Sequence, residues 1–123
     1  MFENDVDYMT SAYKKLYEIE TILKANIQSK LYKKYGMNWD RASELSMPLD
    51  EMFYFDTVSF YFSSPMFNHT FTKDELDKLF QLRAVRNEVA HIRTLSNEEY
   101  DSLDECRQIV SRLEKKPENT RNI

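Results

Sequence analysis

Apolar residues recur at steps of three and four along most of this chain, which is the spacing that places them on one face of an α-helix. Between residues 5 and 35, the positions that follow this spacing are Met9, Tyr13, Leu16, Leu23, Ile27 and Leu31. Gly36 follows, where a left-handed helix C-cap would fall. The pattern predicts a long first helix. Ile19 and Ile22 mark a second apolar edge, so we expect this helix to face both the core and a partner.

A second helix is expected in the middle of the chain. Pro48 fits its first turn, and its body at residues 51–62 is dense in aromatic residues. The aromatic run at 60–62 is also compatible with a strand, but no second strand is available to pair with it, so we favour a helix. Residues 37–47 have weak periodicity and are expected to form a connector that packs through Trp39.

Two capping boxes predict where the last two helices begin. Thr72 and Glu75 have the spacing of a reciprocal cap, and so do Ser96 and Glu99. The first box opens a third helix with apolar positions at Leu76, Leu79, Phe80, Leu82, Val85, Val89 and Ile92. The second opens a fourth helix with a stripe at Tyr100, Leu103, Cys106 or Arg107, Val110 and Leu113. These elements predict an all-α, up-and-down bundle of four or five helices.

The composition supports one helical domain and removes several function classes. A chain of 123 residues forms one domain, expected at 1–116, with a tail at 117–123 that frays. One glycine and three prolines are too few for a sandwich, a barrel or a phosphate-binding glycine loop. The single Cys106 excludes a disulfide framework and a cysteine-based zinc site, and the aspartates show no metal-ligand spacing. We therefore expect no cofactor and no metal.

No apolar run approaches the roughly 20 residues that cross a bilayer, and the acidic start of the chain does not have the pattern of a signal peptide. A cytoplasmic protein without a membrane partner is expected. The net charge of −4 argues against a protein that coats nucleic acid by bulk electrostatics. Three arginines nevertheless cluster around His91, and these are Arg83, Arg86 and Arg93. Taken alone, they are better explained as surface ion pairs with nearby glutamates, which are Glu88, Glu98 and Glu99.

The six residues from Arg86 to His91 carry the most specific chemistry. Arginine binds phosphate bidentately, histidine moves protons near neutral pH, and Asn87 can orient either group. At about 100° per residue, Asn87 and His91 share a helix face, whereas Arg86 lies roughly 140° away from His91. One helix therefore builds only part of a site. Glu20 lies amid apolar neighbours and needs a partner, and an ion pair with Arg83 or Arg86 is favoured over a catalytic role.

The segment Leu82 to His91, with Arg86-Asn87-x-x-x-His91 at its end, resembles the R-x-x-x-x-H signature of the HEPN superfamily, in its abortive-infection and toxin-like branch. The resemblance covers roughly Tyr8 to Leu113, although its specific part is about ten residues long. It implies a metal-independent endoribonuclease in which the ribose 2′-hydroxyl attacks and a cyclic phosphate is left. The alternative is a relative that has lost this activity.

The resemblance also implies roles for single residues. Arg86 would contact the scissile phosphate, His91 would transfer protons, and Asn87 would orient the histidine or the substrate. Supporting contacts to RNA are expected from residues outside the fixed motif, and these are Arg83, Arg93 and Glu20. No cofactor is implied.

A homodimer is expected on two grounds. Relatives typically dimerise with their motif helices facing each other, and in-line attack benefits from an acid and a base while one motif offers one histidine. RNA is the implied substrate, and a neutralising antitoxin or a larger defence complex is the implied partner. Some such partners modify a tyrosine soon after the motif histidine, but Ile92 and Arg93 stand here. Two alternatives stay open: a non-catalytic HEPN-like module that binds a protein, a nucleotide or RNA, and a bundle in which the motif occurs by chance.

Other candidates are weaker. His69 lies in a predicted loop and is expected to be solvated. The aromatic residues that look free for base stacking lie near the end of the first helix, and these are Tyr32, Tyr35 and Trp39. An alternative path for RNA follows the lysines of the same region, Lys30, Lys33 and Lys34.

Overall fold

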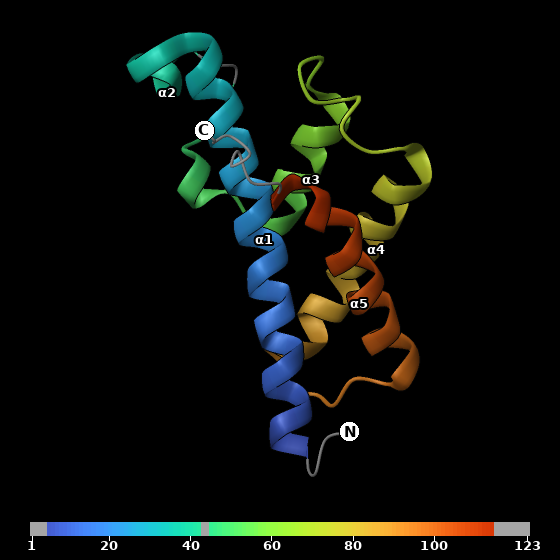
Figure 1. The fold of residues 1–123 in the computed structure, drawn as a ribbon. Coiled ribbons are helices and arrows are strands. Elements are labelled where there is room, and N and C mark those ends of the chain that lie inside the picture. The colour runs from blue at the N-terminus through green and yellow to red at the C-terminus, as the bar shows by residue number, and fades with distance from the viewer. Residues whose placement is uncertain (1–4, 43–44, 115–123) are drawn as a thin grey trace, which may run out of the picture.

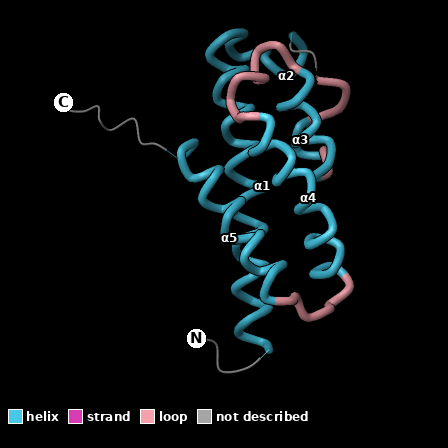
Figure 2. The backbone as a smooth tube through the Cα atoms, turned by 90° about the vertical axis from the view of Figure 1, so that its right-hand side faces the viewer, coloured by secondary structure: helices cyan, strands magenta, loops and turns pink. Residues whose placement is uncertain are grey.

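The computed structural model describes residues 5–42 and 45–114, which fold into helices and short connections with no strand between them. The α-helices are α1 (Asp5–Tyr35), α2 (Trp39–Ala42), α3 (Tyr54–Ser63), α4 (Lys73–Ala90) and α5 (Asn97–Ser111). Short 3₁₀ helices lie at Gly36–Asn38, Leu49–Glu51 and Arg112–Glu114. The predicted all-α bundle is confirmed (Figures 1 and 2). The tail predicted to fray lies outside the described residues.

The long α1 forms one side of the bundle, and α4 and α5 pack against it (Figure 1). α5 runs in the same direction as α1, because Tyr100 near its start stacks on Tyr8 and Arg107 further along pairs with Glu18. α4 runs the opposite way, since its C-terminal end lies beside the first half of α1. α4 and α5 therefore run in opposite directions.

The connection between α1 and α3 differs from the one between α4 and α5. Before α3 begins, the chain has come back alongside α1, since Lys24 Nζ donates a hydrogen bond to the Met52 carbonyl at 2.7 Å. α3 then ends near the end of α1, where Ser64 and Leu31 line the same hollow. α1 and α3 consequently run in the same general direction. Trp39 in this connection is half-buried against the core, as expected.

The buried stripe of α1 lacks two of the predicted residues, Met9 and Tyr13, and gains two others, Ala12 and Ile19. Its members are Ala12, Leu16, Ile19, Leu23, Ile27 and Leu31. Tyr13, which was expected in the core, is 60% exposed, because the smaller Ala12 takes the buried position in that turn. Ile19 is fully buried and Ile22 is half-buried against the core. The expectation that these isoleucines form an edge facing a partner is therefore wrong.

The second long helix starts later than expected. Pro48 precedes the 3₁₀ turn at Leu49–Glu51, and the chain is extended at Phe53 before α3 begins at Tyr54. The Asp56 carboxylate accepts a hydrogen bond from the Phe53 N–H at 3.1 Å, which satisfies one of the donors left open at a helix start. The prediction that this helix begins at residue 51 is therefore wrong by about one turn, because this local cap fixes the start at Tyr54.

Three other predicted helix ends are confirmed. The Thr72 hydroxyl accepts from the Glu75 N–H at 3.1 Å, and the Glu75 carboxylate accepts from the Thr72 N–H at 2.9 Å. The same exchange joins Ser96 and Glu99 at 3.1 and 2.8 Å. Gly36 has a φ of 76°, the left-handed conformation expected after α1. These caps set the start of α4 and α5, and so fix where the motif lies.

Candidate functional site

The motif lies at the C-terminal end of α4, where the helix closes in a Schellman turn. α4 ends at Ala90, and His91 is its C-cap. The Arg93 N–H donates to the Glu88 carbonyl at 2.9 Å, which is the six-residue closure of this turn. The third helix therefore stops before Ile92, to which the apolar pattern had extended it. His91 leaves the helix at its last turn and is exposed.

Ile92 occupies the left-handed position of that turn. Its φ is 59°, and in the described ranges no other residue besides glycine has a positive φ. A β-branched side chain is a rare choice there, and the conformation costs about 1–2 kcal/mol relative to the right-handed one. The side chain is 88% exposed, so little packing compensates for the strain. A strained, exposed aliphatic residue thus lies directly after His91.

Arg86 is held by one edge of its guanidinium group. Its Nε donates to Glu20 Oε2 at 2.5 Å, which confirms the predicted ion pair and assigns it to Arg86 and not to Arg83. The two terminal nitrogens make no hydrogen bond to any residue at 5–42 or 45–114. Because a guanidinium binds phosphate through parallel N–H groups, this geometry leaves the phosphate-binding edge open.

Arg86 lines a shallow pocket of about 190 Å³ between α1 and the end of α4. The other residues around it are Tyr13, Leu16, Tyr17, Glu20, Val89 and Ala90. Neither Asn87 nor His91 reaches this pocket, and both are exposed on another face of α4. The structure therefore brings Glu20 and Arg86 together and separates them from His91, as the roughly 140° offset between the two motif positions predicts.

The supporting arginines lie outside this pocket. Arg83 Cζ lies 4.9 Å from the centre of the Phe55 ring, a cation–π contact. Arg93 Nη1 lies 3.7 Å from Glu88 Oε2, so for this arginine the surface ion pair is confirmed. Both side chains remain exposed, and a contact with RNA from either stays a prediction.

An aromatic surface on α3 and α4 was missed by the sequence analysis. It consists of Phe55, Phe62 and Phe80, and we call it the α3/α4 aromatic surface. The Phe80 ring lies 5.8 Å from Phe55 and 6.4 Å from Phe62, and Phe62 is 62% exposed. On an ideal helix, Asn87 and His91 both lie within about 20° of Phe80 around the axis. The exposed motif residues therefore continue this surface along α4. The repeat of Phe55 and Phe62 at a seven-residue step was the available signal.

The other candidate side chains differ in how far they are exposed. His69 is exposed, as expected. Tyr32 is exposed, but Tyr35 and Trp39 are half-buried, so two of the three residues expected to be free for stacking pack against the core. The lysines of the alternative RNA path, Lys30, Lys33 and Lys34, are exposed on α1. Cys106 is fully buried, and this burial raises the pKa of its thiol to about 12, so it remains a protonated core residue.

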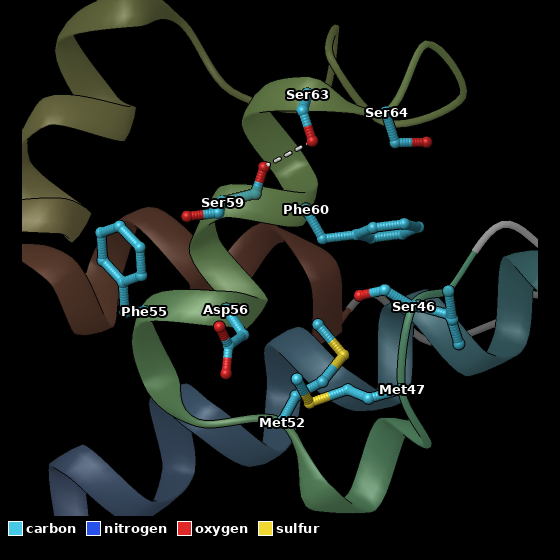
Figure 3. Close-up of a pocket in the computed structure, with 10 residues that line it drawn as sticks. Ser46, Met47, Met52, Phe55, Asp56, Ser59, Phe60, Ser63 and Ser64 are labelled. Atoms are coloured by element: carbon cyan, nitrogen blue, oxygen red, sulfur yellow. Dashed lines mark hydrogen bonds between the residues drawn. The ribbon is translucent and has the colours of Figure 1, made fainter.

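A separate hollow of about 300 Å³ lies between α3 and the preceding segment (Figure 3). Its polar lining consists of serine hydroxyls and the Asp56 carboxylate that caps α3. The Ser63 hydroxyl is already bonded to the Ser59 carbonyl at 3.0 Å. Among the described residues that line this hollow, none is basic. It therefore offers nothing to neutralise a phosphate.

Within the described part of the chain, no three histidine, cysteine or acidic side chains gather as metal ligands would. The helices of residues 5–42 and 45–114 include none with the length and apolar character needed to span a bilayer. No family model, curated protein or solved structure matches this chain.

Proposed function

We propose that this protein is a metal-independent endoribonuclease of the HEPN type, with a composite active site formed between two copies of the chain. One observation supports this most directly. Arg86 is anchored by Glu20 through Nε alone, while Asn87 and His91 stand exposed at the end of the same helix. Arg86 is thus fixed in position while its phosphate-binding edge stays open. This arrangement suits an arginine that binds a substrate anion better than it suits an arginine that only stabilises the fold.

The proposed reaction needs few parts. The terminal nitrogens of Arg86 bind the scissile phosphate and stabilise the charge that develops on its oxygens. His91 takes the proton from the ribose 2′-hydroxyl or gives one to the departing 5′-oxygen, and Asn87 orients the imidazole or the substrate. The 2′-oxygen then bonds to phosphorus as the bond to the 5′-oxygen breaks, which leaves a cyclic phosphate. The second proton-transfer group comes from the partner copy.

The dimer is proposed to form across the α3/α4 aromatic surface. Two exposed phenylalanines, Phe55 and Phe62, lie on either side of the half-buried Phe80, and contiguous exposed apolar surface of this kind marks a site that another protein covers. A two-fold axis next to this surface makes the same patch face itself. Because Asn87 and His91 continue the line of Phe80 along α4, an axis that runs nearly parallel to α4 would bring the two histidines toward each other. This proposal keeps the dimer expected around the third helix and drops the contribution expected from the isoleucine edge of α1, because Ile19 is buried and Ile22 packs against the core.

The proposed setting is that of a toxin or a phage-defence effector of the abortive-infection kind in the cytoplasm, neutralised by an antitoxin or held in a larger complex. The resemblance of the segment from Leu82 to His91 is the support for this part. Ile92 and Arg93 follow the histidine, so a partner that modifies a tyrosine there is not part of the proposal.

A second function is favoured by one specific observation. The Glu20 carboxylate neutralises Arg86, and in a single chain Arg86 and His91 do not share a pocket. A non-catalytic HEPN-like module that binds RNA, a nucleotide or a protein would have the same features. The two functions differ in whether His91 is needed for an event beyond binding.

The test is cleavage of single-stranded RNA by the purified protein in EDTA, with the product ends identified by mass spectrometry. We expect cyclic-phosphate ends, and we expect His91→Ala and Arg86→Ala each to abolish cleavage without loss of helicity. His69→Ala is the matched control, because this histidine is also exposed but lies in the loop before α4. Cleavage that survives both motif substitutions would remove these residues from the mechanism. Binding without cleavage by the wild-type protein would establish the non-catalytic alternative.

The proposed dimer is tested by light scattering. The wild-type protein is expected at twice the chain mass of 14.8 kDa, and Phe62→Asp is expected to be monomeric and inactive. Tyr32→Asp is the control, since Tyr32 is also an exposed aromatic residue but lies on α1. An active monomer at micromolar concentration would contradict the composite site.

A further inference from the structure

Two tyrosines on the exposed face of α1 flank the pocket that contains Arg86. Tyr13 and Tyr17 are 60% and 62% exposed, and both line that pocket. Their rings lie 6.5 Å apart with an angle of 26° between their planes, so they present nearly parallel faces. Neither ring is needed for the core, because Ala12 and Leu16 fill the buried positions of these turns.

The chemistry around the two rings favours a single-stranded nucleic acid. The same face of α1 continues N-terminally through Thr10 and Val6, which carry no charge. The carboxylate that lies on this face, Glu20, is already paired with Arg86. A phosphate bound at the open edge of Arg86 therefore meets no unpaired carboxylate among the residues that line the pocket. Proteins that hold single strands combine a cation for the backbone with aromatic faces on which bases stack.

We propose that Tyr13 and Tyr17 form a base-stacking shelf that positions the nucleotide next to the phosphate bound by Arg86. The inference rests on the proposed function, because it takes RNA as the ligand. The shelf is a positioning device and not a catalytic one: the rings hold bases, and the reaction takes place at the phosphate. It gives an acidic protein affinity for RNA that does not depend on many phosphate contacts.

RNA fits this face better than a second copy of the chain does. The rings are tyrosines with nearly parallel planes beside an open guanidinium edge, which complements the alternating bases and phosphates of a strand. The α3/α4 aromatic surface, by contrast, is built from phenylalanines, with Arg83 already stacked on Phe55. A protein partner at the shelf is an outcome that the experiment detects.

The experiment measures binding of a short, labelled single-stranded RNA of mixed sequence to full chains that all carry His91→Ala, so that the strand is not cut. Tyr13→Ala and Tyr17→Ala are compared with Tyr13→Phe and Tyr17→Phe, and Tyr32→Ala is the control for an exposed tyrosine on the same helix. A strand of the same length without bases is the control ligand. Circular dichroism and light scattering are recorded for every variant.

We expect each alanine variant to bind RNA about 5- to 150-fold more weakly, which is the range measured for loss of one base–aromatic stack. The phenylalanine variants should keep wild-type affinity, because the ring faces remain. The slope of log affinity against log salt should not change, since no phosphate contact is lost. The strand without bases should bind weakly and equally to all variants.

Unchanged binding by both alanine variants would overturn the shelf, and so would phenylalanine variants that bind as poorly as the alanine variants. Conversion of a dimer to a monomer by the alanine variants would identify the face as an interface between copies, which also overturns the proposal. Failure of the proposed ribonuclease function gives a different result from failure of the shelf. If the wild-type chain binds RNA through the tyrosines and does not cut it, the shelf stands and the ribonuclease falls. If it cuts RNA, and if Tyr13→Ala and Tyr17→Ala made in the chain that retains His91 keep the wild-type KM, the shelf alone falls.

Discussion

Replacing Ile92 by glycine should stabilise this protein. The residue has a φ of 59° and a side chain that is 88% exposed. Relief of the left-handed strain contributes about 1–2 kcal/mol. The greater freedom of glycine in the unfolded chain opposes this by about 0.5–1 kcal/mol. The net expectation is a gain of about 0.5–1 kcal/mol in the free energy of unfolding, because almost no buried area is lost with the side chain.

Urea denaturation followed by circular dichroism measures this gain, and a Tm about 2–5 °C higher should accompany it. Ile92→Ala is the informative comparison, because alanine keeps the Cβ atom and therefore most of the strain. Thr94→Gly is the position control, since Thr94 is exposed in the same connection without a positive φ. Only Ile92→Gly should become more stable. An equal gain for Ile92→Ala, or a loss for Ile92→Gly, would refute the assignment of strain to this turn.

The same variant tests whether the strain has a purpose. Strained, exposed residues persist in proteins mainly where function needs them, and stabilising such a position often lowers activity. Ile92 directly follows His91, so its side chain is well placed to contact a partner copy or the RNA. We therefore expect Ile92→Gly to be more stable but to cleave RNA more slowly. A variant that gains stability and keeps full activity would show that the side chain has no role.

Three further predictions concern the contacts that position the motif. Glu20→Ala and Arg86→Ala should each lower the free energy of unfolding by no more than about 1 kcal/mol, because the ion pair is partly exposed. In urea titrations the double variant should lose less stability than the sum of the two single losses, and strict additivity would contradict the ion pair. Ser96→Ala should cost about 1 kcal/mol and Ser96→Gly only a few tenths, and equal losses in denaturant would show that the hydroxyl is not the cap. The Arg112 guanidinium lowers the pKa of Glu75 to about 2, so its stabilisation is complete above the unfolded-state pKa of about 4.3 and is lost as pH falls toward 2. Glu75→Gln should accordingly be less stable at pH 7 and show a flatter acid unfolding curve, and an unchanged curve would contradict this.

The positions of the helix starts were predictable where a few neighbouring residues decide them. The reciprocal bonds of Thr72 with Glu75 involve a side chain and a backbone group three residues apart, so the sequence contains the whole interaction. The left-handed Gly36 after α1 is local in the same way. The start of α3 was missed, because Asp56 reaches back to the Phe53 N–H and the aromatic density of this segment hid that cap.

The choice between neighbouring apolar positions was not predictable from periodicity. Ala12 and Tyr13 both fit the stripe of α1, since a step of three or four allows either. The choice depends on tertiary contacts that the spacing does not contain: in the structure Ala12 is fully buried and Tyr13 is 60% exposed. The exposed face that results is the one on which the base-stacking shelf is proposed.

The same limit applies to the motif itself. Helix geometry alone separates Arg86 from His91 by roughly 140°, but it does not say which of the two faces the rest of the protein. That choice depends on a contact between α1 and α4, the ion pair of Glu20 with Arg86, whose partners are 66 positions apart in the chain. With Arg86 turned toward α1, His91 lies on another face of α4, in line with Phe80 along the helix. A site that uses both residues must then be completed by something outside the single chain, and for a reaction that needs two proton-transfer groups a second copy is the simplest way to supply what is missing.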